Sequence, residues 1–475
     1  MTRRIAFLFS KMIKKLYGTL VVAVFLAGLF LSLYHLTESP PTWMDEGIIT
    51  QTSRNLAQQG IYAIQTGPQK FVSPGFVTTS YPVTFPVALF FKLFGPNLYS
   101  ARLVMVIYLI SFILLAFVYT RRRFGDWPAL ATLAFLVSFG PLYGHGKAVL
   151  GEVPGLFWFV AFLVFLDKIS AGDRRSLVFI LAGLFGGLAI VTKPIFLLLV
   201  PAFLIANLFL RLWVNVPQRH LQLACLFTLL PALLWLKVQF SGDSFIATIN
   251  QYINTHGTLN VGTFISNLTR FFTEPQAVYA LIALLIWTFF LYRLYKEKAI
   301  IKPSELTAFF FSLLIYLAYL RTAGFYRYFF PGEVLTLLFV PGYFLTAIPR
   351  RLLAYTILAF LLAGQTYYLL TNSWVLKSFN GKRYFELNQT VSLIPKNKNI
   401  FVFQAPEVIN FLQGNNYTQY LPVTPTIILG RENISFVQEG VPDVVIGPET
   451  MANKLSLDKY YLNASSDRYE IYYRR

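Results

Sequence analysis

Two adjacent carboxylates, Asp45 and Glu46, follow the first long apolar segment of the chain, in the stretch Trp43-Met44-Asp45-Glu46-Gly47. A charged side chain near a membrane boundary costs free energy unless it is solvated or paired, so an acidic pair there indicates a functional site. The structural alternative is a helix N-terminus, where acidic residues interact favourably with the helix dipole. A carboxylate in this place suits a general base acting on a hydroxyl or amine, or a ligand for a divalent cation.

A further carboxylate, Glu152, lies beside His145 and Lys147 at the start of an apolar segment. The structural interpretation is an ion pair between Lys147 and Glu152. The functional interpretation is a carboxylate that faces Asp45 across a cavity, where the two activate an acceptor or hold a divalent cation. Asp45 and Glu152 are therefore the candidate ligands of any metal ion.

Basic and aromatic residues of suitable type for anion binding occur later in the chain. Lys193 stands between two apolar runs, in Val191-Thr192-Lys193-Pro194, where it either snorkels to the interface or binds an anion. Arg321, Arg327 and Tyr328 precede another apolar run. A guanidinium pairs well with a phosphate, whereas the structural alternative is anchoring at the membrane interface.

The composition places these residues in a membrane protein. The chain has 475 residues, of which 56% are hydrophobic and 13% charged, and its net charge is +19. The Lys and Arg residues form short clusters between apolar runs, which is typical of cytoplasmic loops and not of a nucleic-acid surface. We expect no nucleic-acid partner. The single cysteine, Cys225, excludes an intrachain disulfide.

The apolar runs predict about eleven membrane-spanning helices and a mainly α fold. They lie near 16–36, 98–120, 127–144, 150–167, 176–191, 194–212, 220–240, 276–295, 305–321, 327–347 and 351–371. With the N-terminus in the cytoplasm, the dense basic clusters at 121–123, 168–175, 211–219, 293–302 and 350–351 all fall on the cytoplasmic side. Asp45, Glu152, Lys193 and Arg327 then share the opposite, outer face. That combination suits carboxylates acting on an acceptor and cations stabilising a phosphate leaving group.

The chain divides into a membrane domain, 1–372, and a C-terminal extracytoplasmic α/β domain, 373–475. An outer loop, 37–97, contains a helix at 48–59 that ends at Gly60 and an apolar segment, 84–94, too short to span the bilayer. We expect these two segments to form interfacial helices. In the tail, 400–403 and 444–446 read as buried strands, and 406–412 as a short helix.

Several short motifs, in this order, resemble the GT-C superfamily of polytopic glycosyltransferases, in the branch of protein O-mannosyltransferases and the lipid A aminoarabinose transferase. The matching residues are Asp45-Glu46, Phe90-Phe91-Lys92-Leu93-Phe94-Gly95, Ala101-Arg102-Leu103, Glu152 before Pro154, Thr192-Lys193, and Arg327-Tyr328 before Pro331. The resemblance covers roughly residues 1–345. It implies an inverting transfer from a polyprenyl-phosphate-linked sugar on the non-cytoplasmic face, with Asp45 as catalytic base and Glu152 as the second acidic residue.

The remaining site candidates follow from charge and position. Lys193, Arg327, Tyr328 and Lys147 are expected to bind the donor phosphate, and Glu46, Tyr81, Arg321 and His145 are further candidates. The chain departs from the family pattern at Ser80-Tyr81-Pro82-Val83, where the family often has Lys or His with two prolines, at Glu152, often Asp, and at Pro194, often Gly. These departures concern the sugar and the acceptor more than the reaction class.

A transporter or flippase of a lipid-linked substrate is the rival prediction, because it would also have charged residues in an outer cavity. Transporters usually carry internal repeats and broken helices near the bilayer midplane, and the sequence indicates neither. The glycosyltransferase interpretation leaves a lipid, a glycan or a protein as acceptor. The expected location is the plasma membrane of a bacterium.

Overall fold

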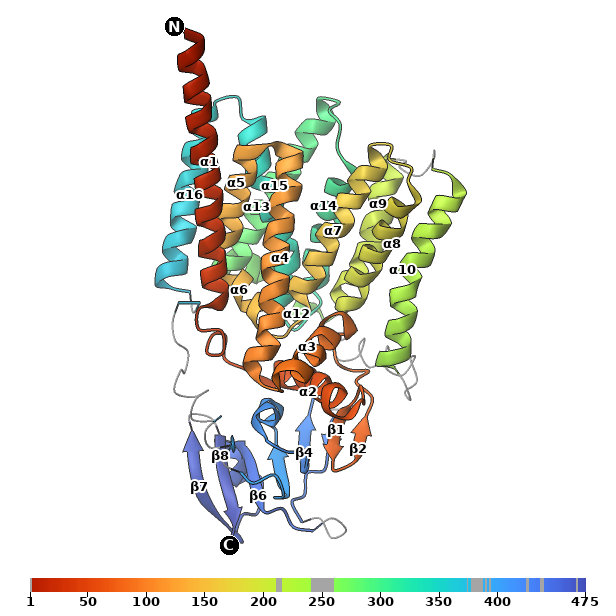
Figure 1. Cartoon of the computed structure of the whole chain (residues 1–475), viewed down its shortest axis with the longest axis vertical. Coiled ribbons are helices and arrows are strands. Elements are labelled where there is room, and N and C mark those ends of the chain that lie inside the picture. Colours follow the sequence, from red (N-terminus) through yellow and green to blue (C-terminus); the bar gives the residue numbers. More distant parts are fainter. Residues whose placement is uncertain are drawn as a thin grey trace.

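The protein consists of a long helical bundle, a layer of short helices across one of its ends, and a small sheet domain beyond that layer (Figure 1). The computed structural model describes residues 2–210, 216–240, 260–373, 375–376, 388, 391–392, 394–423, 427–435, 440–466 and 469–475. The sheet domain lies at the end of the bundle opposite the N-terminus (Figure 1).

Helices occupy every one of the predicted membrane segments. They are α1 (Thr2–Leu33), α4 (Leu98–Phe124), α5 (Asp126–Ser138) with α6 (Gly140–Lys147), α7 (Glu152–Ser170), α8 (Ser176–Thr192), η1 (Pro194–Leu198) with α9 (Leu199–Leu210), α10 (Gln218–Gln239), α13 (Pro275–Lys296), α14 (Pro303–Tyr319), α15 (Phe330–Ala347) and α16 (Arg351–Thr371). Residues 211 and 212 of the predicted 194–212 segment lie outside the described part.

Length and apolar composition make seven of these helices candidate spans, or eight if α5 and α6 form one bent span. The other three predicted spans, α8, η1 with α9, and α14, are apolar but only 17 residues long or shorter. A 17-residue helix is about 26 Å long, which is at the lower limit for crossing a bilayer. The prediction of a polytopic, mainly helical fold is confirmed.

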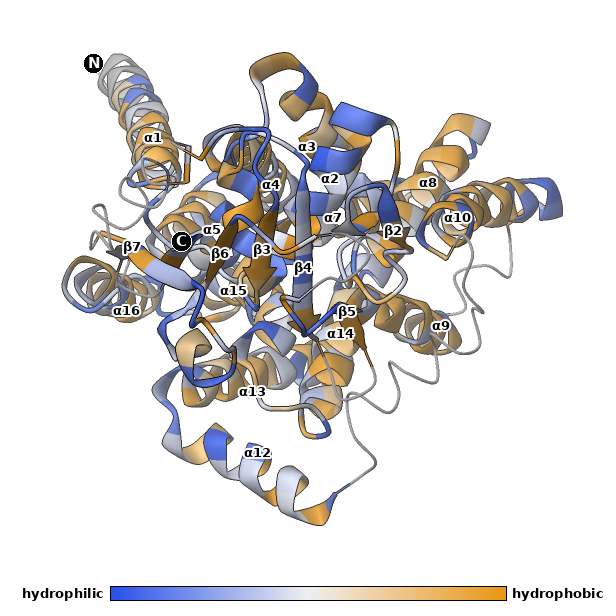
Figure 2. Ribbon diagram, turned by 90° about the horizontal axis from the view of Figure 1, so that it is seen from below, coloured by the Kyte–Doolittle hydropathy of each residue, from blue (hydrophilic) through white to orange (hydrophobic). Residues whose placement is uncertain are grey.

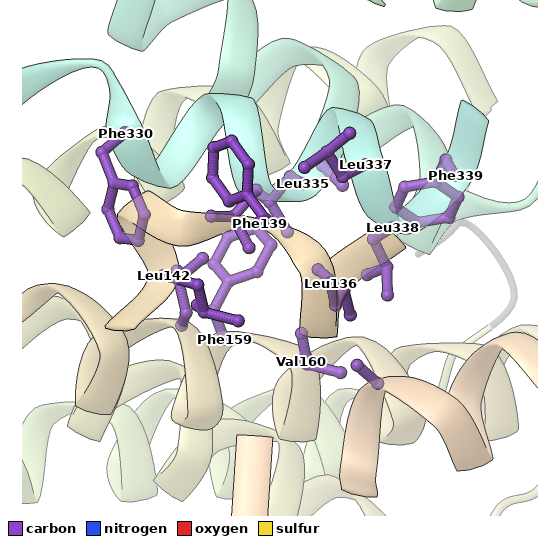
Figure 3. Close-up of a cluster of buried hydrophobic side chains, with 14 of the residues drawn as sticks. Leu136, Phe139, Leu142, Phe159, Val160, Phe330, Leu335, Leu337, Leu338 and Phe339 are labelled. Atoms are coloured by element: carbon purple, nitrogen blue, oxygen red, sulfur yellow. The ribbon is translucent and has the colours of Figure 1, made fainter. Parts of the chain in front are cut away.

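The predicted span at 127–144 bends by 64° between α5 and α6. Phe139 lies at this bend, and it and Leu142 face Phe330 and Leu335 of α15 and Phe159 of α7 (Figure 3). These side chains are buried and belong to the large apolar cluster of the bundle. The bend therefore packs against α7 and α15, just before the segment that leads to Glu152.

The outer loop forms the layer between the bundle and the sheet domain (Figure 1). It contains α2 (Met44–Gln59), a hairpin of β1 (Ile64–Gly67) and β2 (Lys70–Val72), and α3 (Tyr81–Phe94). The predicted helix at 48–59 begins earlier, at Met44, and ends as expected at Gly60, whose φ of 72° lies in the left-handed region. The acidic pair therefore occupies the first turn of α2. A further amphipathic helix, α12 (Val261–Thr273), lies at the periphery (Figure 2).

In the described part of the C-terminal domain, six strands form a sheet in the order β5-β4-β3-β6-β8-β7. The strands are β3 (Ile400–Phe403), β4 (Tyr417–Pro422), β5 (Ile428–Gly430), β6 (Val444–Pro448), β7 (Tyr460–Ser466) and β8 (Tyr469–Arg474). The central pairs β4–β3 and β3–β6 are parallel, and the outer pairs are antiparallel.

The predicted strands are confirmed as β3 and β6, whose side chains are almost entirely buried, as expected for strands covered on both faces. The predicted helix at 406–412 is a 3₁₀ helix, η3 (Pro406–Phe411), and a second one, η4 (Glu449–Asn453), follows β6. Where the boundary between the two domains lies stays a prediction.

Helix α10 lies at the edge of the bundle and packs along α8 (Figure 1). The two backbones approach closely at Gly183 and Gly187 of α8, spaced as in small-residue interfaces of membrane helices. A methyl group added at Gly183 would lie 2.2 Å from the Ala224 carbonyl oxygen. At the C-terminal end of α10, the Gln239 amide donates to the carbonyls of Pro74 and Val77, so this packing also positions the loop 37–97.

Replacing Gly183 with alanine should lower the stability of the protein, because the added methyl group must push α10 away from α8. Thermal unfolding in detergent should show a fall in Tm. Gly364→Ala is the matched control, since a methyl group there meets nothing within 4 Å. Equal Tm values for the two variants would contradict the close packing.

Candidate active site

The first turn of α2 presents Asp45 to Arg327, which lies in the short 3₁₀ helix η2 (Tyr326–Tyr328) just before α15. An Arg327 guanidinium N–H donates to Asp45 Oδ2. The guanidinium carbon also lies 5.1 Å from the ring centre of Trp43 and 5.4 Å from those of Phe325 and Tyr328. Aromatic faces attract a cation at such distances. Arg327 is thus held by one carboxylate and three rings.

A second ion pair joins Glu152, the first residue of α7, to Lys193, the residue that ends α8. Both side chains are buried. The first residue of α3 follows Ser80, whose backbone N–H donates to the Thr192 carbonyl and whose hydroxyl donates to Val191. These contacts tie the outer loop to the segment that carries Lys193.

The two ion pairs lie close enough to interact with each other. Arg327 interacts electrostatically with Glu152 as well as with Asp45, and Lys193 interacts with Asp45 as well as with Glu152. Burial opposes the charge of Arg327, but the carboxylates of Asp45 and Glu152 outweigh it and raise the pKa of the guanidinium. Residues from four separate segments of the chain therefore form one charged site.

Three polar atoms around this site are buried without a hydrogen-bond partner among the described residues. They are Glu152 Oε2, Arg327 Nε and His145 Nδ1. The His145 ring lies 4.4 Å from Phe330 and 5.7 Å from Tyr326, and it interacts electrostatically with Glu152. Buried polar atoms are normally satisfied, so an acceptor and two nitrogens left over in one place indicate where a ligand binds.

Glu46 has a different environment from its neighbour Asp45. Its carboxylate accepts two hydrogen bonds from Arg102 of α4, at 2.8 and 2.6 Å, and one from the Val149 backbone N–H at 3.0 Å. Glu46 and Arg102 are both fully buried. Arg102 also donates to the carbonyls of Leu36 and Pro40. Glu46 therefore joins α2 to α4 and to the segment before α7, in addition to lying at a helix N-terminus.

The other candidates lie away from the two ion pairs. Lys147 does not pair with Glu152; its ammonium donates to the Tyr34 carbonyl at 2.5 Å. The Tyr81 hydroxyl donates to the Pro231 carbonyl of α10 at 3.3 Å. Arg321 lies on the exposed loop after α14. His145, by contrast, interacts electrostatically with Glu152, Lys193 and Arg327.

Two residues of the site were not singled out as candidates from the sequence. Trp43 was only part of a motif, and nothing in its local pattern indicates a partner 284 positions away, at Arg327. Arg102 did carry a signal, because an arginine near the start of a long apolar helix needs a buried partner.

The described residues contain no group of three or more His, Cys, Asp or Glu side chains that could hold a metal ion. The two carboxylates suggested as ligands, Asp45 and Glu152, are each paired with a basic side chain. A divalent cation would have to displace both cations, so this donor set does not fit a metal site.

Known proteins resemble this chain in part of its sequence and in its fold. The family model for dolichyl-phosphate-mannose-protein mannosyltransferases matches residues 82–235. Solved GT-C glycosyltransferases share the fold over nearly the whole chain, which confirms the resemblance to that superfamily at the level of the fold. No curated protein matches the sequence.

ArnT from Cupriavidus metallidurans in the apo state is similar, with a TM-score of 0.67, 15% identity, and coverage of 96% of this chain and 98% of that one. The same protein bound to undecaprenyl phosphate gives a TM-score of 0.63 at 13% identity, with 95% and 97% covered. The oligosaccharyltransferase AglB from Archaeoglobus fulgidus, in complex with an inhibitory peptide and a dolichol-phosphate, is also similar. Its TM-score is 0.56 at 12% sequence identity, and the match covers 92% of this chain and 70% of that one.

Replacing Glu46 with glutamine should destabilise the protein by about 3–5 kcal/mol, because the buried Arg102 loses its charge partner. Unfolding in detergent would measure the loss. Glu297→Gln is the matched control: Glu297 pairs with Arg293 at 2.7 Å, but its side chain is 52% exposed, so the expected change is below about 1 kcal/mol. A wild-type Tm for Glu46→Gln would show that the buried pair does not hold α2.

Proposed function

We propose that the protein is an inverting glycosyltransferase that moves a sugar from a polyprenyl-phosphate donor to a lipid, glycan or protein acceptor. The reaction would take place on the non-cytoplasmic face of the membrane, with the N-terminus in the cytoplasm and the sheet domain outside. The matched family and the structural neighbours support this reaction class. ArnT has been solved with undecaprenyl phosphate and AglB with dolichol-phosphate, both polyprenyl phosphates.

The observation that carries the proposal is the convergence of Asp45, Glu152, Lys193 and Arg327 on one site. These residues were selected from the sequence for their chemistry, and they form two neighbouring ion pairs. The site lies where α2 meets the end of the bundle, not near the middle of the bundle (Figure 1). Transporter sites lie near the bilayer midplane, so this position favours the transferase over a transporter.

In the proposed reaction, Asp45 accepts the proton of the acceptor hydroxyl or amine as that group attacks the anomeric carbon. The bond between this carbon and the phosphate oxygen breaks, and the electron pair leaves with the polyprenyl phosphate. A single displacement of this kind inverts the anomeric configuration. Lys193 and Arg327 stabilise the phosphate as its charge grows. Glu152 holds the Lys193 ammonium in place through their ion pair.

Arg327 is suited to bind the donor without giving up Asp45. A guanidinium has five N–H donors in a rigid fork, and one of them holds Asp45 Oδ2 while Nε has no partner among the described residues. The rings of Trp43 and Tyr328 beside the guanidinium restrict its movement. A phosphate oxygen at Nε would therefore lie close to the carboxylate that takes the proton.

Replacing Asp45 with asparagine should lower the rate of transfer of labelled sugar from a polyprenyl-phosphate donor by about 10²–10⁴-fold, because asparagine cannot accept the proton. Asp126→Asn is the control and should leave the rate unchanged. The Asp126 side chain pairs with Arg121 at the opposite end of the bundle and is 52% exposed. Equal rates for Asp45→Asn and wild type would reject Asp45 as the base. If the wild-type protein transfers sugar from none of the lipid-linked donors, the proposed function is rejected.

Replacing Arg327 with lysine keeps the charge but removes the fork, so the KM for the donor should rise about tenfold or more. The measurement is donor titration with the purified protein. Arg121→Lys, from the same exposed pair as Asp126, is the control and should behave as wild type. An unchanged donor KM would show that Arg327 does not bind the phosphate.

A further inference from the structure

The α2 helix that carries Asp45 is held from two sides. Two residues beyond Asp45, a methyl group added at Gly47 would lie 2.3 Å from the backbone nitrogen of Glu407 and 2.6 Å from its Cα. Glu407 belongs to η3 of the sheet domain, so α2 and the sheet domain touch backbone to backbone at this point. No side-chain rotation can relieve a clash with backbone atoms.

The contact continues along α2 as a buried polar interface. The Asn410 amide donates to the Thr50 hydroxyl at 2.6 Å, and the Gln51 amide donates to the Tyr417 hydroxyl at 2.8 Å. The Gln419 amide in turn donates to Gln51 Oε1 at 3.2 Å. All of these side chains are buried. Buried hydrogen bonds fix relative position more strictly than apolar contacts do, because each needs a set geometry.

Arg54 completes the interface at the far end of α2. Its guanidinium donates to the carbonyl oxygens of Ile409, Leu412 and Gly414, all in the sheet domain. Arg54 is fully buried. A buried charge without a carboxylate partner is costly unless backbone dipoles surround it, so this arginine stabilises the docked arrangement. Its distance from Asp45 is roughly 13 Å along the helix.

The opposite side of the first turn belongs to the membrane domain. Glu46 is fixed there by Arg102 of α4 and by the Val149 backbone. The sheet domain also contributes Leu421 and Leu429 to the apolar cluster that contains Ile48 of α2. Asp45 therefore lies at the junction of two domains, and its position depends on both.

We propose that the sheet domain positions Asp45 for catalysis, with Gly47 and Arg54 as positioning residues that act through α2. This inference rests on the proposed function. According to this proposal, the sheet domain affects the rate of the chemical step. A catalytic base that is misplaced by about 1 Å can lower the rate by about 10²-fold. The alternative roles of such a domain are to bind the acceptor or only to cover the site.

The principal test is Gly47→Ala in the full-length protein. Alanine favours the helix itself, so α2 stays intact while its methyl group separates it from η3. We expect kcat for sugar transfer to fall tenfold or more, with the KM values for donor and acceptor within about twofold of wild type. Gly364→Ala, a glycine-to-alanine change in an open position of α16, should leave all three parameters unchanged.

Arg54→Gln weakens the same interface far from Asp45 and provides a second, independent variant. It should also lower kcat and spare both KM values. If the two substitutions act by releasing the same domain, the double variant should be little slower than the slower single variant. Amide hydrogen exchange of residues 44–59 and 406–414 should rise in both single variants, which measures undocking without relying on activity.

The outcomes separate this inference from the proposed function. Wild-type kcat in Gly47→Ala, with or without faster exchange, would overturn the positioning role. A raised acceptor KM with unchanged kcat would overturn it as well and assign the sheet domain to acceptor binding. Additive losses in the double variant would also count against it. Absence of transfer by the wild type would instead overturn the proposed function.

Discussion

The structure depends on the pairing of buried and half-buried charges at the end of an apolar bundle that meets α2. An unpaired charge in such a place is costly, and three carboxylates there are paired with basic side chains from other segments. Glu46 binds Arg102, Glu152 binds Lys193, and Asp45 binds Arg327. These pairs join α2, α4, α7, the end of α8 and η2. The same electrostatic constraint that closes the fold therefore assembles the candidate site.

The three consecutive residues Asp45, Glu46 and Gly47 have three different surroundings. Helical geometry turns successive side chains by about 100°, so neighbours in sequence face different partners. Asp45 faces Arg327, Glu46 faces Arg102, and Gly47 faces the sheet domain. One turn of helix thus connects the charged site, the bundle and the C-terminal domain. Neither domain alone determines where the carboxylate lies.

The sequence was sufficient to predict what depends on composition and local pattern. Apolar length and basic clusters predicted helices in the segments where the structure has them. The chemistry of charges beside apolar runs selected Asp45, Glu152, Lys193 and Arg327, which form two neighbouring ion pairs and whose roles stay predictions. It was not sufficient to predict pairing over long separations. The choice of Lys193 over Lys147 as the partner of Glu152 depends on how α7 and α8 pack. Likewise, the sequence predicts an interfacial helix at 48–59 but does not reveal what covers it. Gln51 and Arg54 are buried because a domain more than 340 residues later packs on them.

The charge balance of the site suggests a use for the contact between Arg327 and Asp45 in the proposed reaction. The negative charges of Asp45 and Glu152 balance the positive charges of Lys193 and Arg327, so the four side chains together carry no net charge. In the proposed reaction, the proton taken up by Asp45 neutralises its carboxylate, while the phosphate gains one negative charge as the sugar leaves. The attraction between Arg327 and Asp45 weakens as that between Arg327 and the phosphate strengthens. A guanidinium shared by base and leaving group therefore couples deprotonation of the acceptor to departure of the phosphate, without requiring a metal ion to absorb the change.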